Sequence, residues 1–274
     1  MKGRVHVGVG GWSFPAWRGT FYPERLPRAR ELAGASRALT SIEINVTFYR
    51  AQRPETFARW REETPDGFVF AVKAPRAATG SRPLAGAGEA IERFLRGGVQ
   101  ELGEKLGPID WQLPPGHALD LRDLEAFVRL LPRTLGGRPL RHAIEFRHRN
   151  FRDPQVVALL REHGVAAVVT GDSRYPSIPD LTAPFVYARI MGTTASEPLG
   201  YSSKDLDVWT RRAKDWAAGG VASGLPLVSP LPADARPRNV FLFVVRGAKE
   251  RNPAAARALV ERVASPTEQS RSRP

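Results

Sequence analysis

Eight short apolar runs recur along the 274-residue chain, and stretches with helical periodicity separate most of them. The runs are rich in β-branched and aromatic residues, as buried strands are. In chain order they are VHVGV (5–9), SIEIN (41–45), FVFAVK (68–73), IDWQL (109–113), HAIEFR (142–147), AAVVTG (166–171), FVYARI (185–190) and NVFLFVV (239–245). Strands that alternate with helices form parallel sheets, and eight such units favour a closed barrel over an open sheet. We therefore predict an α/β fold with a single (β/α)8 barrel of the TIM type.

Several of the intervening stretches carry helix start and stop signals. Pro54 stands at a natural first helical position. Asp120 and Asp153 are expected N-caps, and Gly164 is expected to end the helix that follows Asp153. The predicted helices cover 26–39, 54–63, 90–106, 120–132, 153–164, 203–218 and 253–264. The helix over 90–106 is predicted as one segment despite its glycines, because its apolar residues share one face.

The connection between the sixth and seventh strands differs from the others. Its sequence, DSRYPSIPDLTAP (172–184), is rich in proline, so we predict a weak or missing helix there. No linker divides the chain, which predicts one barrel domain over 1–264. The polar residues 265–274 are expected to form a frayed tail.

Composition limits the compartment and the chemistry. No apolar run approaches the roughly 18 residues that a membrane-spanning helix needs. The N-terminus lacks the apolar stretch of a signal peptide, so we expect a cytoplasmic protein with no membrane contact. The chain has no cysteine, which excludes thiol nucleophiles and zinc–thiolate sites.

The net charge of +13 raises the question of nucleic-acid binding. Only six of the 41 basic residues are lysines, and the arginines are dispersed along the chain. This pattern is typical of compositional bias rather than of a binding patch. We therefore keep nucleic-acid association only as a minor alternative, and the oligomeric state stays open.

Alternation along the strands predicts a polar lining inside the barrel. Successive strand side chains face opposite ways, so if the isoleucines of SIEIN pack outward, their polar neighbours point inward. The side chains that this argument places inside are Glu43, Asn45, Asp110, Gln112, Glu145, Arg147 and Arg189. Lys73 ends the third strand, and Asp172 follows the sixth. Because TIM-barrel sites form at the carboxyl ends of the strands, we expect these groups to meet in one cavity there.

Two interpretations of this lining remain open. Buried charges are costly unless they are paired, so the groups either form a structural salt-bridge network or face a ligand. In a ligand site, Glu43 and Glu145 are the candidate catalytic acid and base. Lys73 is then placed to orient an anion or to polarise a carbonyl. We expect no metal and no cofactor, because a metal site at a barrel mouth usually includes histidine.

Four segments together resemble the YecE-like family, also called domain of unknown function 72. They are GGWSFPAWRGTFYPERLP (10–27), SIEINVTFYRAQRPETFARWREETPDGFVFAVKAPR (41–76), LGPIDWQLPP (106–115) and AIEFRHRNF (143–151). The resemblance implies a (β/α)8 barrel with a cleft at the carboxyl ends of the strands. It brings no assigned reaction with it.

The resemblance also implies a set of cleft residues. These are Trp12, Glu43, Asn45, Thr47, Tyr49, Lys73, Gln112, Glu145, Arg147, His148 and Asp172. Three places depart from the family pattern. The chain has Gly80 and Met191 where the family usually has histidine, and Val245-Arg246 where it usually has Asn-Asn. The losses remove candidate proton carriers and metal ligands from the barrel mouth.

Two main functional hypotheses follow. The first is an enzyme that carries out acid–base chemistry on a small polar or anionic substrate. In it Glu43 and Glu145 are catalytic, and Lys73, Arg147 and Arg189 hold the substrate. The second is a non-catalytic barrel that binds a small ligand at a diverged site.

Overall fold

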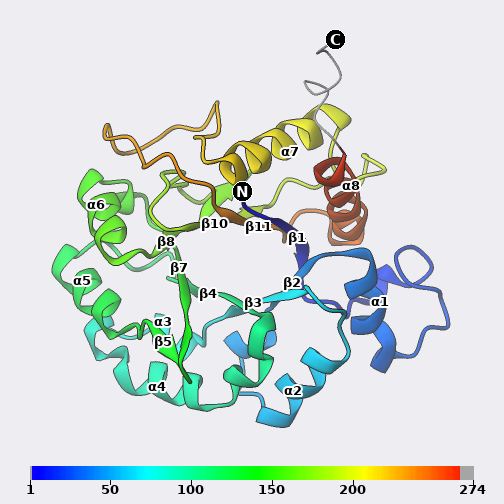
Figure 1. Ribbon diagram of the computed structural model, residues 1–274, viewed down its shortest axis with the longest axis horizontal. Coiled ribbons are helices and arrows are strands. Elements are labelled where there is room, and N and C mark those ends of the chain that lie inside the picture. Colours follow the sequence, from blue (N-terminus) through cyan, green and yellow to red (C-terminus); the bar gives the residue numbers. More distant parts are fainter. Residues whose placement is uncertain (1, 266–274) are drawn as a thin grey trace.

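The computed structural model describes residues 2–265 as a ring of strands surrounded by helices (Figure 1). The strands are β1 (Val5–Gly10), β2 (Ser41–Ile44), β3 (Val69–Lys73), β4 (Leu106–Gln112), β7 (Arg141–Glu145), β8 (Ala166–Ala167), β9 (Val169–Gly171), β10 (Phe185–Ile190) and β11 (Asn239–Val244). Their order in the sheet is β8-β7-β4-β3-β2-β1-β11-β10-β9, and all neighbours are parallel.

The two ends of this sheet are halves of one strand. Only Val168 separates β8 from β9. β8 pairs with β7, whereas β9 pairs with β10, so the sixth strand joins the two ends of the sheet. The nine segments therefore correspond to the eight predicted strands. The predicted (β/α)8 barrel is confirmed.

The outer helices follow the predicted pattern closely. They are α1 (Glu31–Ala38), α2 (Pro54–Glu62), α3 (Arg76–Thr79), α4 (Gly88–Arg96), α5 (Leu121–Leu130), α6 (Pro154–His163), α7 (Ser203–Ala218) and α8 (Asn252–Ala264). The Asp120 side chain accepts hydrogen bonds from the first turn of α5, and Asp153 does the same for α6. Gly164 ends α6 with φ at +65°. α1 starts later than predicted, because residues 28–30 form a 3-10 turn before it.

The single helix predicted over 90–106 is wrong. α4 ends at Arg96, and a 3-10 segment covers Val99–Lys105 before β4 starts at Leu106. Gly98 separates the two pieces with φ at +100°, a conformation that disfavours side chains. A Cβ atom at this position would lie 2.6 Å from Cα of Pro54 at the start of α2. The glycine thus allows a close approach of the two segments, which the apolar periodicity did not reveal.

Residues 172–184, between β9 and β10, contain no helix. A second irregular segment, 219–238, runs between α7 and β11 and lies outside the barrel between α6 and α7 (Figure 1, orange). The buried carboxylate of Asp180 accepts hydrogen bonds from the N–H groups of Val228 (2.8 Å) and Ser229 (2.9 Å). The two irregular segments therefore cover together the face that a helix would otherwise cover.

A small hairpin was not predicted. β5 (Thr134–Leu135) and β6 (Arg138–Pro139) pair in antiparallel register around Gly136 and Gly137, both with positive φ. It lies apart from the barrel sheet in the hydrogen-bonding pattern.

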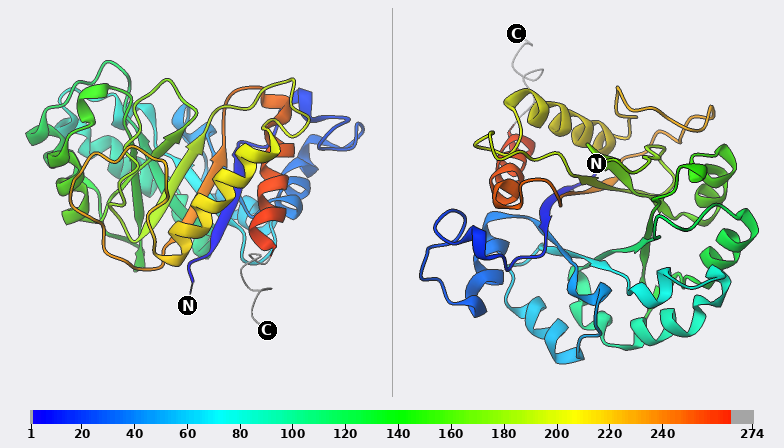
Figure 2. Two further views of the ribbon diagram at one scale, coloured as in Figure 1. Left: turned by 90° about the horizontal axis from the view of Figure 1, so that it is seen from above. Right: turned by 180° about the vertical axis from the view of Figure 1, so that it is seen from behind.

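Side-chain alternation divides the apolar core into two layers. Between the strands and the helices lies the larger layer, which includes Ile42, Ile44, Trp111 and Ile144. A smaller cluster fills the barrel interior and is made of Val69, Ala71, Ala143, Ala166, Val168, Ala183, Phe185, Tyr187, Met191, Phe241, Phe243 and Val245. Views from above and from behind show the helices wrapped around the strands (Figure 2). Within residues 2–265, no helix is long and apolar enough to span a bilayer. The expected tail over 265–274 lies outside the described residues except for Ser265.

Candidate functional site

Charged side chains converge inside the barrel near the carboxyl ends of the strands. Arg189 of β10 is at their centre. Its Nη2 donates to Oε1 of Glu43 on β2 at 3.0 Å, and its Nε lies 3.0 Å from Oε2 of the same carboxylate. Its Nη1 forms an ion pair with Glu145 on β7. One guanidinium therefore joins two carboxylates from strands on different sides of the barrel.

Further hydrogen bonds complete the partners of both glutamates. Arg147 Nε donates to Oε1 of Glu145 at 2.7 Å, and Gln112 Nε2 donates to its Oε2 at 3.0 Å. The hydroxyl of Tyr187 donates to Oε2 of Glu43 at 2.7 Å. We call these six residues the ion-pair cluster: Glu43, Gln112, Glu145, Arg147, Tyr187 and Arg189. It is packed rather than open, because both glutamates are completely buried and Arg147 is the most exposed member.

The electrostatics of the cluster fix its charge state. Burial alone would raise the pKa of Glu145, but Arg189, Arg147 and the hydrogen bonds lower it to about 2. Burial opposes the charge on Arg189, yet Glu145 and Glu43 raise its pKa well above the ordinary value. Burial and the neighbouring Glu43 raise the pKa of Tyr187 well above its usual range. The ion pairs thus persist across physiological pH.

Asp110 of β4 lies beside this cluster without a partner. It is paired in sheet register with Lys73 at the end of β3 and is 0% exposed. Within residues 2–265, neither of its carboxylate oxygens has a hydrogen bond. Burial, with the nearby Glu145 and Glu43, raises the pKa of Asp110 to about 7 against the opposing effect of Arg189. Alternation placed this residue inward, but its lack of a partner became visible only in the structure.

Lys73 is the second polar group without a direct partner. Within the described part of the chain its ammonium has no hydrogen bond and no carboxylate within 4.0 Å. It lies 4.4 Å from the ring centroid of Phe48 and is 8% exposed. Burial and the nearby Arg189 lower the pKa of its amine. Lys73 is thus slightly more exposed than Asp110, its register partner on β4.

A cationic group surrounds an aromatic ring at the outer edge of the cluster. The guanidinium of Arg147 lies 4.5 Å from the ring centroid of Tyr175, that of Arg174 at 5.2 Å and that of Arg246 at 5.8 Å. We call these four residues the rim cluster. Arg174 and Arg246 form no ion pair with a carboxylate in residues 2–265. The rim cluster was not predicted as a unit, since Arg174 and Tyr175 belong to an irregular segment without periodicity.

The remaining candidates lie around the cluster in different ways. Asn45 is close to Glu43, since a Cβ atom on Gly10 would lie 2.8 Å from the Asn45 amide nitrogen and 3.5 Å from Glu43 Oε1. Trp12 packs edge-on against Trp60, with ring centroids 5.1 Å apart. His148 caps a 3-10 turn by accepting a hydrogen bond from the N–H of Asn150.

Asp172 does not join the ion-pair cluster. Its backbone has φ at +52°, and its Oδ2 accepts hydrogen bonds from Tyr201 (3.0 Å) and from Trp209 Nε1 (3.1 Å). Tyr201 in turn accepts from the N–H of Gly192 at 2.7 Å. The carboxylate therefore holds the turn after β9 against α7. Of the nine residues expected in one cavity, five belong to the ion-pair cluster, three lie beside it (Asn45, Lys73 and Asp110), and Asp172 lies apart.

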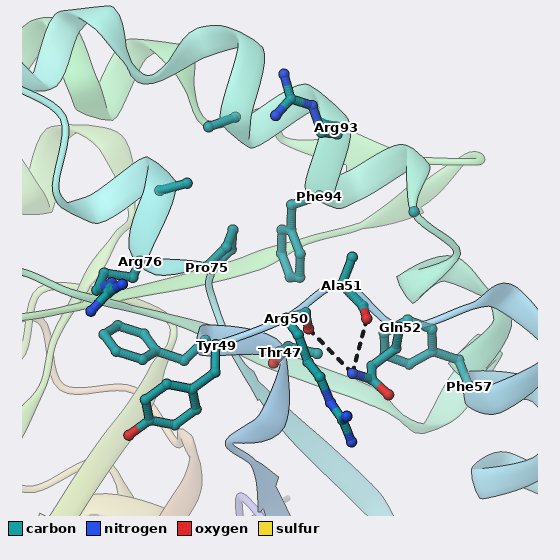
Figure 3. Close-up of a pocket in the computed structure, with 14 residues that line it drawn as sticks. Thr47, Tyr49, Arg50, Ala51, Gln52, Phe57, Pro75, Arg76, Arg93 and Phe94 are labelled. Atoms are coloured by element: carbon teal, nitrogen blue, oxygen red, sulfur yellow. Dashed lines mark hydrogen bonds between the residues drawn. The ribbon is translucent and has the colours of Figure 1, made fainter.

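Thr47 and Tyr49 line a separate cavity next to the cluster (Figure 3). The Thr47 hydroxyl donates to the carbonyl of Lys73 at 2.6 Å, which ties the β2–α2 connection to the end of β3. Tyr49 is largely exposed. These two residues thus belong to the wall between the barrel mouth and a pocket on its flank.

The donor set offers little to a metal ion. Among the residues described, no three histidine or carboxylate side chains are grouped so as to hold one. The carboxylates of Glu43 and Glu145 are already occupied by arginine. The chemistry available at this site is that of ion pairs, an amine and an unpartnered carboxyl group.

Comparison with known proteins gives the family. Residues 6–274 match the family described as "Protein of unknown function DUF72". The chain belongs to the DUF72 family. Curated relatives of this DUF72 protein include the UPF0759 protein YunF of Bacillus subtilis, 25% identical over 169 residues, and the UPF0759 protein YecE of Escherichia coli K12, 29% identical over 147 residues. The matched region covers 58% of each chain for YunF, and 54% of this chain and 50% of YecE. The DUF72 protein thus matches only about half the length of these relatives.

Solved structures support the fold of this DUF72 protein. A DUF72 family protein from Thermotoga maritima has a TM-score of 0.67 at 24% identity, covering 94% of this chain and 97% of that one. One from Enterococcus faecalis has a TM-score of 0.67 at 13% identity, covering 96% and 99%. A xylose isomerase-like TIM barrel fused to 4-hydroxyphenylpyruvate dioxygenase has a TM-score of 0.51 at 16% identity, covering 99% of this chain and 45% of that protein. At these sequence identities, the similarity shows only that the proteins share the barrel fold.

Proposed function

We propose that this DUF72 protein is an enzyme that carries out acid–base chemistry on a small anionic substrate at the carboxyl ends of its strands. The observation that carries the proposal is Asp110, a completely buried carboxyl group with no hydrogen bond to either oxygen. Leaving such a group unsatisfied costs on the order of 1–3 kcal/mol, and more when it is charged. Costs of this kind are typical of functional sites rather than of structural networks.

In this proposal Asp110 and Lys73 share the proton that the reaction moves. An ionised Asp110 beside a protonated Lys73 has the same total charge as a neutral acid beside a neutral amine. The two groups are not hydrogen-bonded and lie more than 4.0 Å apart, so in this proposal a substrate group or a water relays the proton between them, without changing the net charge of the buried cluster. Lys73 is on the exposed side, so it meets the substrate, and Asp110 holds the proton behind it.

Glu43 and Glu145 take a different role here from the acid and base expected from the sequence. Both carboxylates are bound to Arg189, and the pKa of Glu145 is held near 2. A carboxylate this strongly bound is a poor proton carrier at neutral pH. We assign to both glutamates the positioning of Arg189, whose positive charge influences Lys73 and Asp110.

The rim cluster supports the choice of an anionic substrate. Guanidinium groups bind carboxylates and phosphates in a bidentate way. Arg174 and Arg246 have no carboxylate partner in the part of the chain described, so their charges are available to a ligand. Arg246 stands where the family pattern has an amide, which indicates a preference particular to this chain.

A second candidate function is a binding barrel without chemistry. It is favoured by the complete pairing of Glu43 and Glu145, and by the fact that no histidine belongs to the ion-pair cluster. In a binding barrel, Asp110 does not exchange its proton with the ligand, whatever its own charge state.

Two measurements test the proposal. The first is a thermal-shift screen of inorganic phosphate, small carboxylates and sugar acids against the parent, Lys73→Ala, Arg246→Ala and Lys249→Ala. Lys249 is the matched control, because its ammonium also lies over a phenyl ring, 5.0 Å from that of Phe14, and it belongs to neither the ion-pair cluster nor the rim cluster. Binding at a hundredfold excess over Kd stabilises the folded state by roughly 2.7 kcal/mol. We expect this gain for the parent and the control, and a smaller gain for the other two variants.

The second measurement follows the Asp110 proton by 13C NMR of aspartate carboxyl groups. We expect one resonance that titrates near pH 7, that is absent in Asp110→Asn and that shifts when a stabilising anion is added. Anion binding without a response of this resonance supports the binding barrel. If no anion stabilises the parent, the polar lining is a structural network.

A further inference from the structure

A cavity of about 400 Å³ lies on the flank of the barrel mouth, outside the ion-pair cluster (Figure 3). Its walls come from the β2–α2 connection (47–52), from α2, from residues 75–77 at the start of α3 and from α4. Pockets that bind small molecules usually measure about 300–1,000 Å³. The cavity is therefore large enough for a compact ligand.

The interior of this cavity is aromatic and apolar. Phe94 of α4 points into the space between α4 and the 47–52 segment, opposite Ala51 and near Pro75 (Figure 3). Phe57 and Phe48 complete the apolar lining. A flat apolar ring fits such a surface, because aromatic pairs gain about 0.5–1.5 kcal/mol beyond the burial of their area.

The charged residues of the lining all have the same sign. They are Arg50, Arg76 and Arg93, and no Asp or Glu belongs to the lining. In Figure 3, Arg93 and Arg50 lie on opposite sides of the cavity. Arg50 and Arg76 form no ion pair within residues 2–265, and the partner of Arg93 is the exposed Glu89 on the same helix. A ligand with a negative group would therefore find a complementary charge at the edge of the cavity.

Tyr49 marks the open side. Its side chain is 78% exposed, although its ring packs edge-on against Phe48 at 5.1 Å between centroids. Exposed tyrosine next to an apolar hollow is typical of surfaces that contact a partner molecule. Here it extends the aromatic surface beyond the cavity.

We propose that this cavity binds an aromatic anion, with the ring between Phe94, Phe57 and Pro75 and the negative group at the arginines. The class comprises aromatic carboxylates and nucleoside monophosphates, which share a planar ring and an anionic group. The site is separate from Asp110 and stands whether or not that residue carries out chemistry. It touches the barrel mouth through Phe48, which lines the cavity and also lies beneath the Lys73 ammonium.

The test is isothermal titration calorimetry with two pairs of probes. Naphthalene-1-carboxylate and AMP are the anionic probes, and 1-naphthalenemethanol and adenosine are their neutral counterparts. We expect at least one anionic probe to bind about tenfold more tightly than its neutral counterpart, the gain of one charge-assisted hydrogen bond. Whether the carboxylate or the nucleotide binds better distinguishes the two sources of ligand.

Two arginines on α4 supply a matched control. Arg93 and Arg96 both form an i,i+4 ion pair with an exposed glutamate, at Glu89 and Glu92, but only Arg93 lines the cavity. We expect Arg93→Glu to weaken the anionic probe about tenfold or more, and Arg96→Glu to leave its affinity within about twofold. Equal weakening by both variants, or equal binding of anionic and neutral probes, would overturn the proposal.

Discussion

Lys73 and Asp110 are register partners on β3 and β4, yet neither side chain has a hydrogen-bond partner in the described residues. In the ion-pair cluster beside them, by contrast, Glu43 and Glu145 hold Arg189 between them. The paired charges of that cluster thus differ from the two unpaired groups between which we propose that a proton moves. The free energy of unfolding should therefore depend on pH differently for variants of the unpaired groups and of the paired groups.

The effect of Asp110→Asn on the free energy of unfolding is expected to become more favourable as pH rises. The folded-state pKa of about 7 lies above the usual value of 3.8, so the folded protein holds this proton more tightly than the unfolded chain. Its contribution to stability is complete below pH 4 and is lost as pH rises through 7. The free energy of unfolding of the variant, relative to the parent, should therefore rise from about pH 4 to pH 7 and level off above it, by at most about 4 kcal/mol in total. Urea unfolding at several pH values measures it. Asp207→Asn, at an exposed ion pair with Arg262, should show no such trend.

Arg189→Met should destabilise the protein strongly at neutral pH. It leaves the buried Glu43 without a cation and the buried Glu145 with Arg147 alone, and removing one partner of a buried ion pair typically costs about 3–5 kcal/mol. Glu145 has a lowered pKa in the parent, so its contribution is present above pH 4.5 and is lost as pH falls toward 2. The difference between variant and parent should therefore shrink in acid. Arg129→Met is the control, because its ion pair with Glu125 is exposed and is worth less than about 1 kcal/mol.

Gly98→Ala tests the break between α4 and the segment that follows. The added Cβ meets Pro54 at 2.6 Å and the backbone has φ at +100°, so both contact and conformation are unfavourable. We expect a loss of roughly 2 kcal/mol or more in unfolding experiments. Gly19→Ala has a similar φ of +77° but nothing within 4 Å, and should lose only about 1 kcal/mol. Equal losses would mean that the contact with Pro54 is unimportant.

Asp180→Ala should loosen the segment over 219–238. The variant removes the acceptor of two backbone N–H groups, at Val228 and Ser229, and leaves them inside a partly buried interface. A cost of about 1–3 kcal/mol is expected. Hydrogen exchange should accelerate in peptides that cover 225–232 and stay unchanged in α5. Unchanged exchange in 225–232 would contradict the role assigned to this carboxylate.

The alternation of strands with helices was sufficient to predict the barrel, and the alternation of side chains along each strand predicted most of the ion-pair cluster. The reason is that a strand with outward Ile42 and Ile44 has only one direction left for Glu43. The same argument placed Asp110 inside but did not distinguish it from Gln112, since alternation says nothing about hydrogen-bond partners. The position of Asp172 was not predictable in this way. Its partners Tyr201 and Trp209 lie 29 and 37 residues further along the chain.

Residues from irregular segments escaped prediction for a related reason. Tyr175 and Arg174 follow no period, and their approach to Arg246 depends on how 172–184 folds over the barrel end. The break at Gly98 was missed because the apolar residues on both sides keep a helical spacing. Only the proximity of Pro54, from a helix more than forty residues earlier, explains it.

The division of the sixth strand into β8 and β9 affects where the barrel sheet opens locally. β7 and β8 share two register pairs and β9 and β10 share three, whereas β10 and β11 share six. Fewer pairs mean a smaller cost of local opening, so this seam should separate before any other part of the wall. The seam adjoins Glu145 on one side and Arg189 on the other. The ion pair between Glu145 and Arg189 therefore connects the two strands that flank the part of the barrel wall with the fewest register pairs. A ligand that broke this ion pair would open the barrel interior to water.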